Sequence, residues 1–384
     1  MRRRSFIKGL AGIGISAVEG PDAIAAIFGK PKRKGIPLRK FGKTGRRVTE
    51  IGFGTLFSHE PGGIEVLERA FELGINYIDT AASYGGGNTE RLLRDFLKAH
   101  RKDVFLATKW RVSKETKAED LLSSLDASLE KMGVDMVDLI QVHGASEEWA
   151  VSHPAVFEAV EKAKKQGKVR FNGVSTHSNQ VRVVRAAMEN KYDSVLVVYN
   201  FMSPPQLTQA LQDARKAGIA VVVMKALSPL GGRDREKAKE ILGTDVNLYT
   251  AALKWVLEKD FVDTVIVSMR NEGHIRDALA ACGVKLSEEE REALRRYAAF
   301  IDKRFCRLCG ECDGVCPEGV SVAEVMRYRM YYREYGAVDY ARALYKGLED
   351  KSGASCNLCG ICNSACPFGI DVAKAVKEAD ILMG

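Results

Sequence analysis

Four polar residues of this 384-residue sequence have the types and spacing needed to move a proton to or from a carbonyl oxygen. Asp79, Lys109 and His143 each lie at the end of a short apolar run, and Tyr84 follows Asp79 by five residues. A free tyrosine titrates near pH 10, but a buried ammonium group beside it favours the phenolate and lowers its pKa. We expect Lys109 to activate Tyr84 as a general acid or base, while Asp79 holds Lys109 by an ion pair. His143 would orient the carbonyl group toward the hydroxyl.

Eight of the nine cysteines form two copies of one spacing in the last part of the chain. The copies are Cys306, Cys309, Cys312 and Cys316, then Cys356, Cys359, Cys362 and Cys366, each ending in Cys-Pro. This spacing is that of bacterial ferredoxins, in which three close thiolates bind one [4Fe–4S] cluster and the fourth ligates the other cluster. It predicts two clusters, one on Cys306, Cys309, Cys312 and Cys366, and the other on Cys316, Cys356, Cys359 and Cys362. Zinc would favour two pairs of ligands, and disulfides are the alternative in an oxidising compartment.

Eight short apolar runs alternate with amphipathic helical patterns in the body of the chain. The runs are residues 48–55, 76–80, 104–109, 136–143, 169–175, 195–199, 219–225 and 263–268, and the helical patterns include 64–73, 119–132, 155–166, 206–217 and 248–258. Their number and size predict an α/β fold, a (β/α)8 TIM barrel over residues 38–300, with the reactive side chains at the carboxyl ends of the strands. A doubly wound sheet is the alternative, but Gly52-Phe53-Gly54 lacks the third glycine of its fingerprint.

The motifs around the four polar residues carry a family resemblance. NYIDTAASY at 76–84, TK at 108–109 and DLIQVH at 138–143, together with FGKTG at 41–45 and IGFGT at 51–55, resemble the aldo-keto reductases. The similarity extends from about residue 38 to 282. It implies that Tyr84 is the general acid or base, supported by the other three residues, and that NADP(H) carries hydride to or from a small carbonyl or alcohol substrate.

The resemblance also implies cofactor contacts, but it is incomplete around the nicotinamide. Residues at the matching positions are Thr55, Ser175, Asn200, Ser268 and Arg270. Arg270 could pair with a 2′-phosphate, because a guanidinium presents a fork of donors to phosphate oxygens. Thr176, Leu196 and Met224 replace side chains that hydrogen-bond or stack in the family. Leu196 and Met224 cannot make those contacts, and Thr176 can make only part of them. Either NADP(H) binds less tightly, or another electron carrier such as a flavin occupies the site.

The chain changes character near residues 301–305, after a helical pattern at 288–300. We expect residues 301–384 to form a small, mainly helical ferredoxin-like domain. The 39 residues between the cysteine runs hold six of the twelve tyrosines, which is too long for the hairpin of a small ferredoxin and resembles helical ferredoxin domains appended to larger redox enzymes. A stripe of four of these tyrosines, Tyr328, Tyr331, Tyr332 and Tyr335, is interpreted as packing, with a redox relay as the alternative. Ser321 and Asp371 have the positions of helix N-caps, and Ser321 with Glu324 fits a capping box.

The first thirty residues fit an export signal. Arg3-Arg4-Ser5-Phe6-Ile7-Lys8 resembles the twin-arginine motif, and an uncharged run at 9–18 precedes Ala23-Ile24-Ala25, a small-x-small cleavage site. The run is too short to span a bilayer, so no transmembrane segment is expected. This pattern predicts export to the periplasm, and a cytoplasmic protein with a basic N-terminus is the alternative.

The net charge of +8 is concentrated at the start of the chain. Residues 1–47 carry 13 Lys and Arg against two acids, whereas the remaining 337 residues hold 45 bases and 48 acids. The body is near neutral, so no basic face for nucleic acid is expected.

Two functional hypotheses follow. In the first, an aldo-keto reductase-type enzyme interconverts a carbonyl and an alcohol and exchanges electrons through two [4Fe–4S] clusters. A hydride carries two electrons and a cluster accepts one, so a flavin is the group that usually stands between them. In the second, the barrel is not catalytic, and the protein is a subunit that passes electrons to a redox partner protein.

Overall fold

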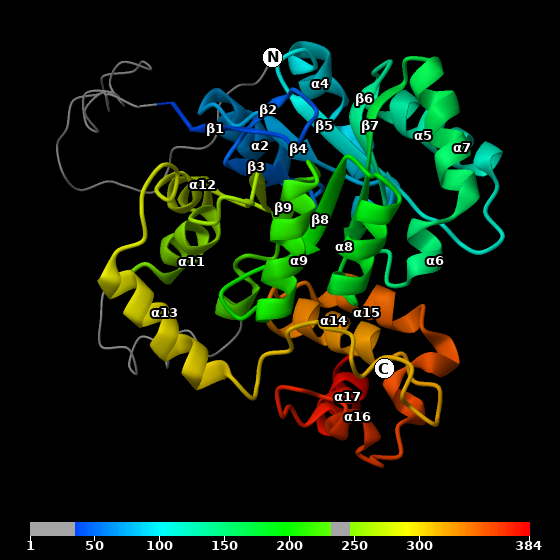
Figure 1. Ribbon diagram of the computed structural model, residues 1–384, viewed down its shortest axis with the longest axis vertical. Coiled ribbons are helices and arrows are strands. Elements are labelled where there is room, and N and C mark those ends of the chain that lie inside the picture. The colour runs from blue at the N-terminus through cyan, green and yellow to red at the C-terminus, as the bar shows by residue number, and fades with distance from the viewer. Residues whose placement is uncertain (1–34, 232–245) are drawn as a thin grey trace, which may run out of the picture. The chain divides into compact units, whose positions relative to one another are not determined.

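The computed structural model describes residues 35–231 and 246–384 (Figure 1). The predicted export signal at residues 1–30 lies outside the described residues and stays a prediction. Among the helices of the described ranges, none has the length and apolar character needed to cross a membrane.

Eight parallel strands close into a barrel, as predicted. They are β3 (Ile51–Gly54), β4 (Tyr77–Asp79), β5 (Phe105–Trp110), β6 (Val137–Val142), β7 (Val169–Thr176), β8 (Ser194–Val198), β9 (Ala220–Met224) and β10 (Thr264–Val267). Each strand pairs with the next along the chain, and β10 closes the ring by pairing with β3 through Val265 and Ile51. Because all strands are parallel, their carboxyl ends meet at one mouth of the barrel.

Helices form a ring outside the strands (Figure 1). Five occupy the predicted patterns, namely α2 (Gly63–Glu72), α5 (Ala118–Met132), α7 (Pro154–Lys165), α9 (Pro205–Lys216) and α11 (Leu248–Leu257). Others are α3 (Thr89–Leu92), α4 (Arg94–His100), α6 (Glu148–Val151), α8 (Gln180–Glu189) and α12 (Glu272–Leu279). The helices bury their apolar faces against the strands; Leu121, Leu125 and Leu129 of α5, for example, are all buried. Gly133 ends α5 with φ +66°, a conformation that glycine adopts without strain.

A hairpin that was not predicted closes the opposite end of the barrel. Strands β1 (Leu38–Lys40) and β2 (Arg47–Thr49) pair antiparallel, and the loop between them carries the buried Phe41. The ring of Phe41 lies 5.8 Å from that of Tyr77 and 4.8 Å from that of Phe105, between ring centroids. This aromatic plug leaves the carboxyl-end mouth as the side at which a ligand can enter.

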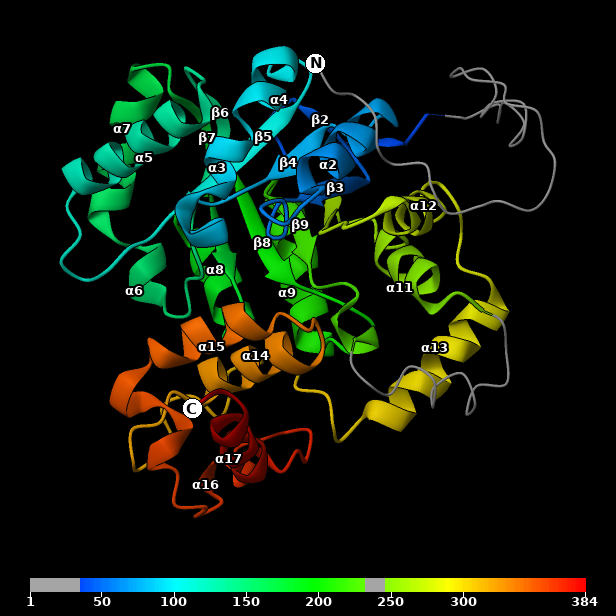
Figure 2. The same cartoon turned by 180° about the vertical axis from the view of Figure 1, so that it is seen from behind.

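The chain leaves the barrel through α13 (Glu288–Ile301) and continues into a mainly helical tail, residues 301–384, as predicted. The tail contains α14 (Val322–Arg333), α15 (Val338–Lys346), α16 (Ile361–Ser364) and α17 (Val372–Met383). In both views α14 and α15 lie between the barrel and the pair α16 and α17 (Figures 1 and 2). Barrel and tail pack into one unit that extends from Ile36 to Gly384.

The first cysteine loop contacts the barrel directly. The backbone N–H of Asn179, in the loop after β7, donates to the carbonyl oxygen of Cys309 at 3.2 Å. A Cβ atom added to Gly310 would lie 2.3 Å from Asn179 Oδ1 and 2.8 Å from its backbone nitrogen. Gly310 is therefore required for this close approach as well as for its φ of +89°.

The predicted capping box at the start of α14 is wrong. Ser321 is the N-cap residue, but its side chain makes no capping hydrogen bond. Glu324 binds Arg327 instead and accepts a hydrogen bond from Tyr328 Oη at 2.8 Å. A charged partner one turn along the helix therefore competes successfully with the cap. The N-cap predicted at Asp371 is confirmed, because its carboxylate accepts from the backbone N–H of Lys374.

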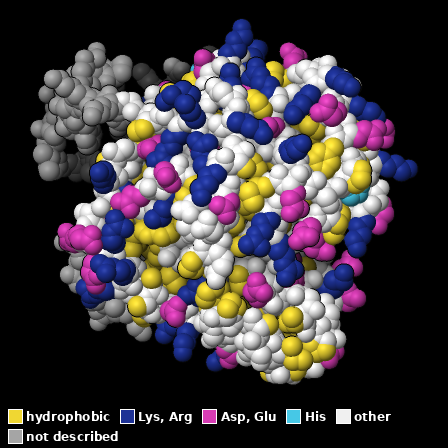
Figure 3. All heavy atoms as spheres, in the orientation of Figure 1, with side chains coloured by type: hydrophobic (Ala, Val, Ile, Leu, Met, Phe, Trp, Pro, Cys, Tyr) yellow, Lys and Arg dark blue, Asp and Glu magenta, His cyan; other side chains and the backbone are white. Residues whose placement is uncertain are grey.

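The surface carries both signs of charge. On the face shown in Figure 3, Lys and Arg side chains are interspersed with Asp and Glu. This mixture agrees with the near-neutral balance of the chain beyond residue 47.

Gly310→Ala and Gly360→Ala form a matched test of the contact between tail and barrel. Both glycines follow the second cysteine of their run and have positive φ, but a Cβ at Gly360 meets nothing within 4 Å. Gly360→Ala should cost about 1–2 kcal/mol from backbone strain alone. In denaturant titrations of the full-length protein, Gly310→Ala should lower the free energy of unfolding by clearly more than Gly360→Ala does, because it also separates the tail from Asn179. An equal decrease in the free energy of unfolding for the two variants would contradict this packing.

Candidate active site

The carboxyl ends of three neighbouring strands position the predicted acid–base group. Asp79 is the last residue of β4, Lys109 is the penultimate residue of β5, and His143 follows β6. In the register of the sheet Asp79 pairs with Ala107, two residues before Lys109. Tyr84 begins a short 3-10 helix, η1 (Tyr84–Gly87), five residues after β4 ends. The structure therefore brings all four residues to the same mouth.

Lys109 and Asp79 form a buried ion pair, as predicted. Their side chains are each 1% exposed. Lys109 Nζ also donates to the Thr80 carbonyl oxygen at 2.7 Å, and Gln141 Nε2 donates to Asp79 Oδ2 at 3.1 Å. Burial raises the pKa of Asp79 and lowers that of Lys109, and the attraction between the two opposes both shifts.

Tyr84 lies beside the ammonium group. Lys109 Nζ is 3.4 Å from Tyr84 Oη and 4.9 Å from the centroid of its ring. The rings of Tyr84 and His143 have centroids 6.0 Å apart and are nearly perpendicular, at 80°. The hydroxyl, the ammonium group and the imidazole thus converge on one point, as the proton-transfer hypothesis requires.

The predicted lowering of the Tyr84 pKa is wrong for this structure. Burial raises the pKa of Tyr84 well above its usual value of 10.0, because the phenolate loses its hydration. The charge of Asp79 raises this pKa further, as do the nearby phenols of Tyr340 and Tyr331 in the tail. Lys109 does not reverse the shift, because its own charge is balanced by Asp79. Tyr84 is therefore a neutral hydrogen-bond donor at physiological pH.

His143 is also neutral. Burial lowers its pKa well below 6.5, and the positive charges of Lys109, Arg111 and Arg327 lower it further. A neutral imidazole carries one ring N–H that can donate to a carbonyl oxygen. This agrees with the predicted orienting role.

A cavity of about 780 Å³ opens beside these residues. Tyr84, Asp79 and His143 line one part of it, and Ser268 and Arg270 line another. Helices α14 and α15 of the tail and the loop between them line it as well, through Glu324, Arg327, Tyr328, Tyr331, Tyr335 and Tyr340. The tail therefore forms one wall of the catalytic cavity, and three of the tyrosines interpreted as packing, Tyr328, Tyr331 and Tyr335, also face it.

Two of the five residues predicted to bind the cofactor line the cavity, Ser268 and Arg270. Arg270 Nη2 donates to Glu60 Oε1 at 2.8 Å, and its guanidinium carbon lies 3.7 Å from the centroid of the Phe57 ring. This fork is held in place at the cavity wall, where a phosphate could reach it.

The other three are buried and bond locally. Thr55 Oγ1 donates to the Asp79 carbonyl at 3.1 Å, Ser175 Oγ donates to the Val142 carbonyl at 3.2 Å, and Asn200 Nδ2 donates to the Lys225 carbonyl at 3.2 Å. None of the three is among the residues that line the cavity. In this structure they hold strand ends together, and the cofactor contacts expected of them stay predictions.

Several residues of the site had no predicted role. Gln141 is buried behind the cavity and binds Asp79, whereas Arg111 and His177 line the cavity and follow β5 and β7 directly. Their positions at strand ends are the same signal that identified Lys109, so sequence reasoning could have found them. Arg327 of α14 gave no such signal, because only the packing of the tail brings it to the barrel.

The cysteines lie in two groups, each of which includes one member of the other run. Burial raises the pKa of the Cys306 thiol to about 11, and the nearby Cys309 and Cys366 add to the shift. Cys366 belongs to the second run but lies with the first. In the other group, burial raises the pKa of Cys362, and the nearby Cys356, Cys316 and Cys359 add to the shift. Cys362 and these three cysteines line one small pocket.

The described cysteines are all free thiols, so no disulfide joins the runs. In residues 35–231 and 246–384, no group of three or more His, Cys, Asp or Glu side chains is arranged to hold a metal ion. Ligands of a single zinc ion crowd to about 2.3 Å from it. A [4Fe–4S] cube binds one thiolate at each of four corners and needs the sulfur atoms further apart. The finding does not discriminate between zinc and a cluster, and the two clusters stay a prediction.

Comparison with known proteins agrees with the geometry of the barrel. The model of the aldo/keto reductase family matches residues 50–243 and 234–299. The chain belongs to this family. The family consists of oxidoreductases, and the similar proteins described below are named as oxidoreductases or reductases. The protein is therefore an aldo-keto reductase-type enzyme.

Curated relatives include an uncharacterized oxidoreductase, YqkF, of Bacillus subtilis, 26% identical over 67% of this chain and 95% of the relative. L-galactose dehydrogenase of Arabidopsis thaliana is 36% identical over 36% of this chain and 48% of its own length. The aldo-keto reductase yakc [NADP(+)] of Schizosaccharomyces pombe is 33% identical over 43% of this chain and 52% of its own length. For the last two relatives, the match spans only about half of the known protein.

Solved structures show the same architecture. The holo form of aldo-keto reductase AKR11C1 from Bacillus halodurans has a TM-score of 0.58 and 25% identity, over 68% of this chain and 96% of that protein. A thermostable aldo-keto reductase, Tm1743, in complex with the inhibitor epalrestat has a TM-score of 0.56 and 27% identity, over 68% of this chain and 99% of that protein.

The raised pKa of Tyr84 can be measured directly. Titration of the wild-type protein and Tyr84→Phe to about pH 11 should give the same tyrosinate absorbance, because a phenol with a pKa well above 10 stays protonated in this range. A deficit of one tyrosinate in Tyr84→Phe, with an apparent pKa below 10, would show instead that Lys109 lowers the pKa.

Proposed function

We propose that this enzyme reduces the carbonyl group of a small substrate to an alcohol with NADP(H), and catalyses the reverse reaction. The observation that supports this most strongly is the Tyr84 hydroxyl beside Lys109, facing a cavity that can hold a ligand. NADPH, when bound, supplies the hydride that adds to the carbonyl carbon.

Tyr84 is the proton donor of the proposed reaction. As the carbonyl π bond breaks, its electron pair moves to the oxygen, which takes the proton from Tyr84 Oη and becomes the alcohol hydroxyl. An alkoxide is a stronger base than a phenolate, so the transfer is favourable even though the pKa of Tyr84 is raised. Lys109 stabilises the phenolate left on Tyr84, and His143 donates a hydrogen bond to the carbonyl oxygen.

The cavity supports NADP(H) as the carrier. It extends from Tyr84 to Ser268 and Arg270, and its size of about 780 Å³ lies in the range of cofactor sites. Ser268 and Arg270 would hold the phosphates, and Met224 and Lys225 would adjoin the nicotinamide. The NADP(+) in the name of the Schizosaccharomyces pombe relative agrees with this proposal.

Two [4Fe–4S] clusters in the tail are the second part of the proposal. Cys306, Cys309, Cys312 and Cys366 would bind one, and Cys316, Cys356, Cys359 and Cys362 the other. A cluster, when bound, takes up or releases one electron. The donor set is thiolate only, and the proximity of Cys366 to Cys306 and of Cys316 to Cys362 supports this exchange of fourth cysteines.

The first cluster site adjoins the loop that leads to the cavity. Cys309 accepts a hydrogen bond from Asn179, two residues from His177, which lines the cavity. This proximity supports exchange of electrons between the tail and the barrel. A hydride corresponds to two single electrons, so a flavin in the barrel would have to divide it between the clusters, and a redox partner protein would be the external donor or acceptor. We propose that the protein reaches the periplasm with these groups already inserted, on the basis of its twin-arginine-like motif alone.

Tyr84→Phe tests the catalytic role. Without the phenolic proton, kcat/KM for carbonyl reduction with NADPH should fall by about 10²–10⁴, while the dissociation constant of NADPH stays unchanged. Tyr332→Phe is the control, since Tyr332 lies on α14 but does not line this cavity. A fully active Tyr84→Phe enzyme would contradict the proposal.

Cys366→Ser tests the exchanged ligands. Because Cys366 lies with the first run, its loss should remove the first cluster and leave the second. Iron analysis should then show half the wild-type content, and the electron paramagnetic resonance signal should match that of Cys309→Ser rather than that of Cys359→Ser. Cys282→Ser, outside both runs, should retain full iron content. A Cys366→Ser signal that matches Cys359→Ser would exclude this assignment.

A further inference from the structure

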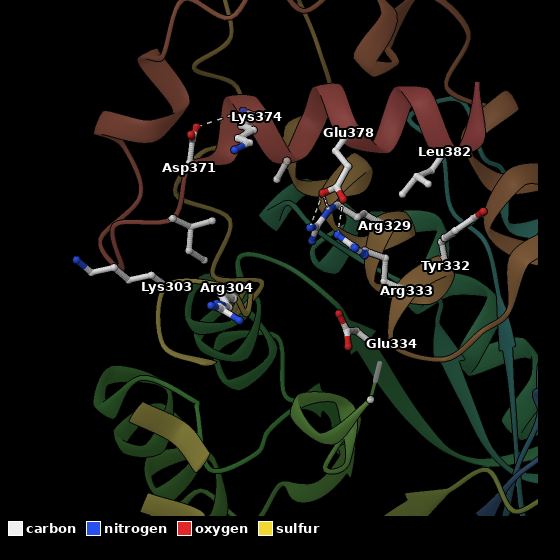
Figure 4. A pocket seen from close by; sticks show the side chains of 13 residues that line it. Lys303, Arg304, Arg329, Tyr332, Arg333, Glu334, Asp371, Lys374, Glu378 and Leu382 are labelled. Atoms are coloured by element: carbon white, nitrogen blue, oxygen red, sulfur yellow. Dashed lines mark hydrogen bonds and ion pairs between the residues drawn. The ribbon is translucent and has the colours of Figure 1, made fainter. Parts of the chain in front are cut away.

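The arginines of α14 face two different cavities. Arg329 and Arg333 both bind Glu378 of α17 in a pocket within the tail, where Arg329 Nη2 lies 2.7 Å from Glu378 Oε2 (Figure 4). Arg327 instead lines the catalytic cavity together with Tyr84. Residues 327 and 329 are two apart, so they project from nearly opposite sides of the helix.

The guanidinium of Arg327 is only partly satisfied. Its Nη2 binds Glu324 and lies 3.3 Å from Tyr328 Oη. Its Nε is buried and has no hydrogen-bond partner among the described residues. The side chain is 15% exposed. A buried donor on a cation is costly when it lacks an acceptor, so this group has an unused capacity to bind an oxygen ligand.

Lys225 is a second buried cation on this cavity. It follows β9 directly and has a φ of +57°, a left-handed conformation that is rare outside glycine. Its carbonyl oxygen accepts from Asn200 Nδ2 at 3.2 Å and from Ser228 Oγ at 2.9 Å, which holds the strained residue in place. Its Nζ donates to Tyr331 Oη at 3.0 Å. Within the described part of the chain, no carboxylate lies within ion-pair distance of Lys225.

Arg327 is the positive charge that acts on Lys225. Burial lowers the pKa of Lys225 well below 10.5, and the charge of Arg327 lowers it further. Burial also lowers the pKa of His177, with Lys225 and Arg327 adding to the shift. The Nδ1 atom of His177 is buried without a partner among the described residues. An anion placed here would relieve the repulsion between Lys225 and Arg327.

Acidic residues of the cavity do not fill this role. Glu324 is paired with Arg327. Asp277, near the end of α12, accepts a hydrogen bond from Asn247, the N-cap residue of α11. Glu334 also lines the pocket of Figure 4 and has a partner of its own.

We propose that Lys225 and Arg327 bind the oxyanion of a substrate that carries both a carbonyl group and a carboxylate or phosphate. Tyr331 links the two ends of this site, because it accepts a hydrogen bond from Lys225 and lies near Tyr84. The carbonyl group would lie at Tyr84, as the proposed function requires. Since Arg327 belongs to α14, the tail takes part in choosing the substrate.

Matched pairs of carbonyl compounds test the proposal with the full-length wild-type enzyme. Succinic semialdehyde, which carries a carboxylate, should have a kcat/KM about 30-fold or more above that of pentanal, since a buried charge pair is worth that much. If phosphate is the natural group, the kcat/KM for glyceraldehyde 3-phosphate should likewise be higher than that for glyceraldehyde. Preference in either pair supports the site and identifies the anion; equal rates within both pairs overturn it.

Two variants assign the preference to residues. Lys225→Met and Arg327→Gln should each reduce the ratio of kcat/KM for succinic semialdehyde to that for pentanal toward one, because the charged aldehyde should bind less tightly and its KM should rise. A structural disturbance would lower both rates together and leave the ratio unchanged, which would overturn the assignment. Arg327→Lys, which keeps the charge, should restore part of the ratio. Arg333→Gln, on the same helix but paired with Glu378, should leave the ratio within about two-fold of wild type.

Binding without turnover separates this proposal from the proposed function. Succinate, an unreactive dicarboxylate, should bind the Tyr84→Phe protein in calorimetry and should lose affinity when Lys225→Met is added. If the wild-type enzyme reduces no carbonyl but succinate binds in this way, the proposed reaction fails and the anion site stands. If carbonyls are reduced without preference and Lys225→Met changes only the affinity for NADPH, the anion site fails and the reaction stands.

Discussion

The active site depends on satisfying one buried ammonium group. Lys109 has three hydrogens to donate, and the structure provides three acceptors, namely the carboxylate of Asp79, the Thr80 carbonyl and the Tyr84 hydroxyl. A buried ion pair is tolerated only when its remaining hydrogen-bonding groups are occupied. The phenol of Tyr84 is thus held by the same requirement that keeps Lys109 inside the barrel. Gln141 completes the arrangement by binding the second oxygen of Asp79.

That requirement constrains the barrel. Asp79, Lys109 and Gln141 lie on β4, β5 and β6, and each must occupy its own register for the bonds to form. A shift of one residue in any strand would turn its side chain to the opposite face. The apolar runs that build these strands therefore also determine the proton-transfer geometry. Burial by the tail then adds a second effect, since covering the mouth keeps both Tyr84 and His143 neutral.

Much of the barrel could be predicted because its causes are local. Buried parallel strands require continuous apolar runs, so all eight strands could be located, and adjacent strand ends identified Asp79, Lys109 and His143 from the sequence. The failures have two different causes. Glu324 was expected to cap α14 with Ser321 but binds Arg327, one turn along the same helix, and the pattern alone does not decide between these two local partners. The pKa of Tyr84 was expected to fall, because the sequence shows that a lysine is available. The sequence does not show how much water is excluded from the phenol, and this burial raises the pKa.

The sequence by itself determined the order of the strands, the reactive residue types at their ends and the ferredoxin spacing of the cysteines, because each of these is written in short runs of neighbouring residues. Tertiary structure alone decided that α14 and α15 form a wall of the catalytic cavity and that Arg327 and Lys225 both line it. These features join residues about 100 to 240 positions apart, and their energies depend on burial and on charges from other elements. No local sequence pattern predicts this burial or these charge interactions, because they arise only when the tail packs on the barrel.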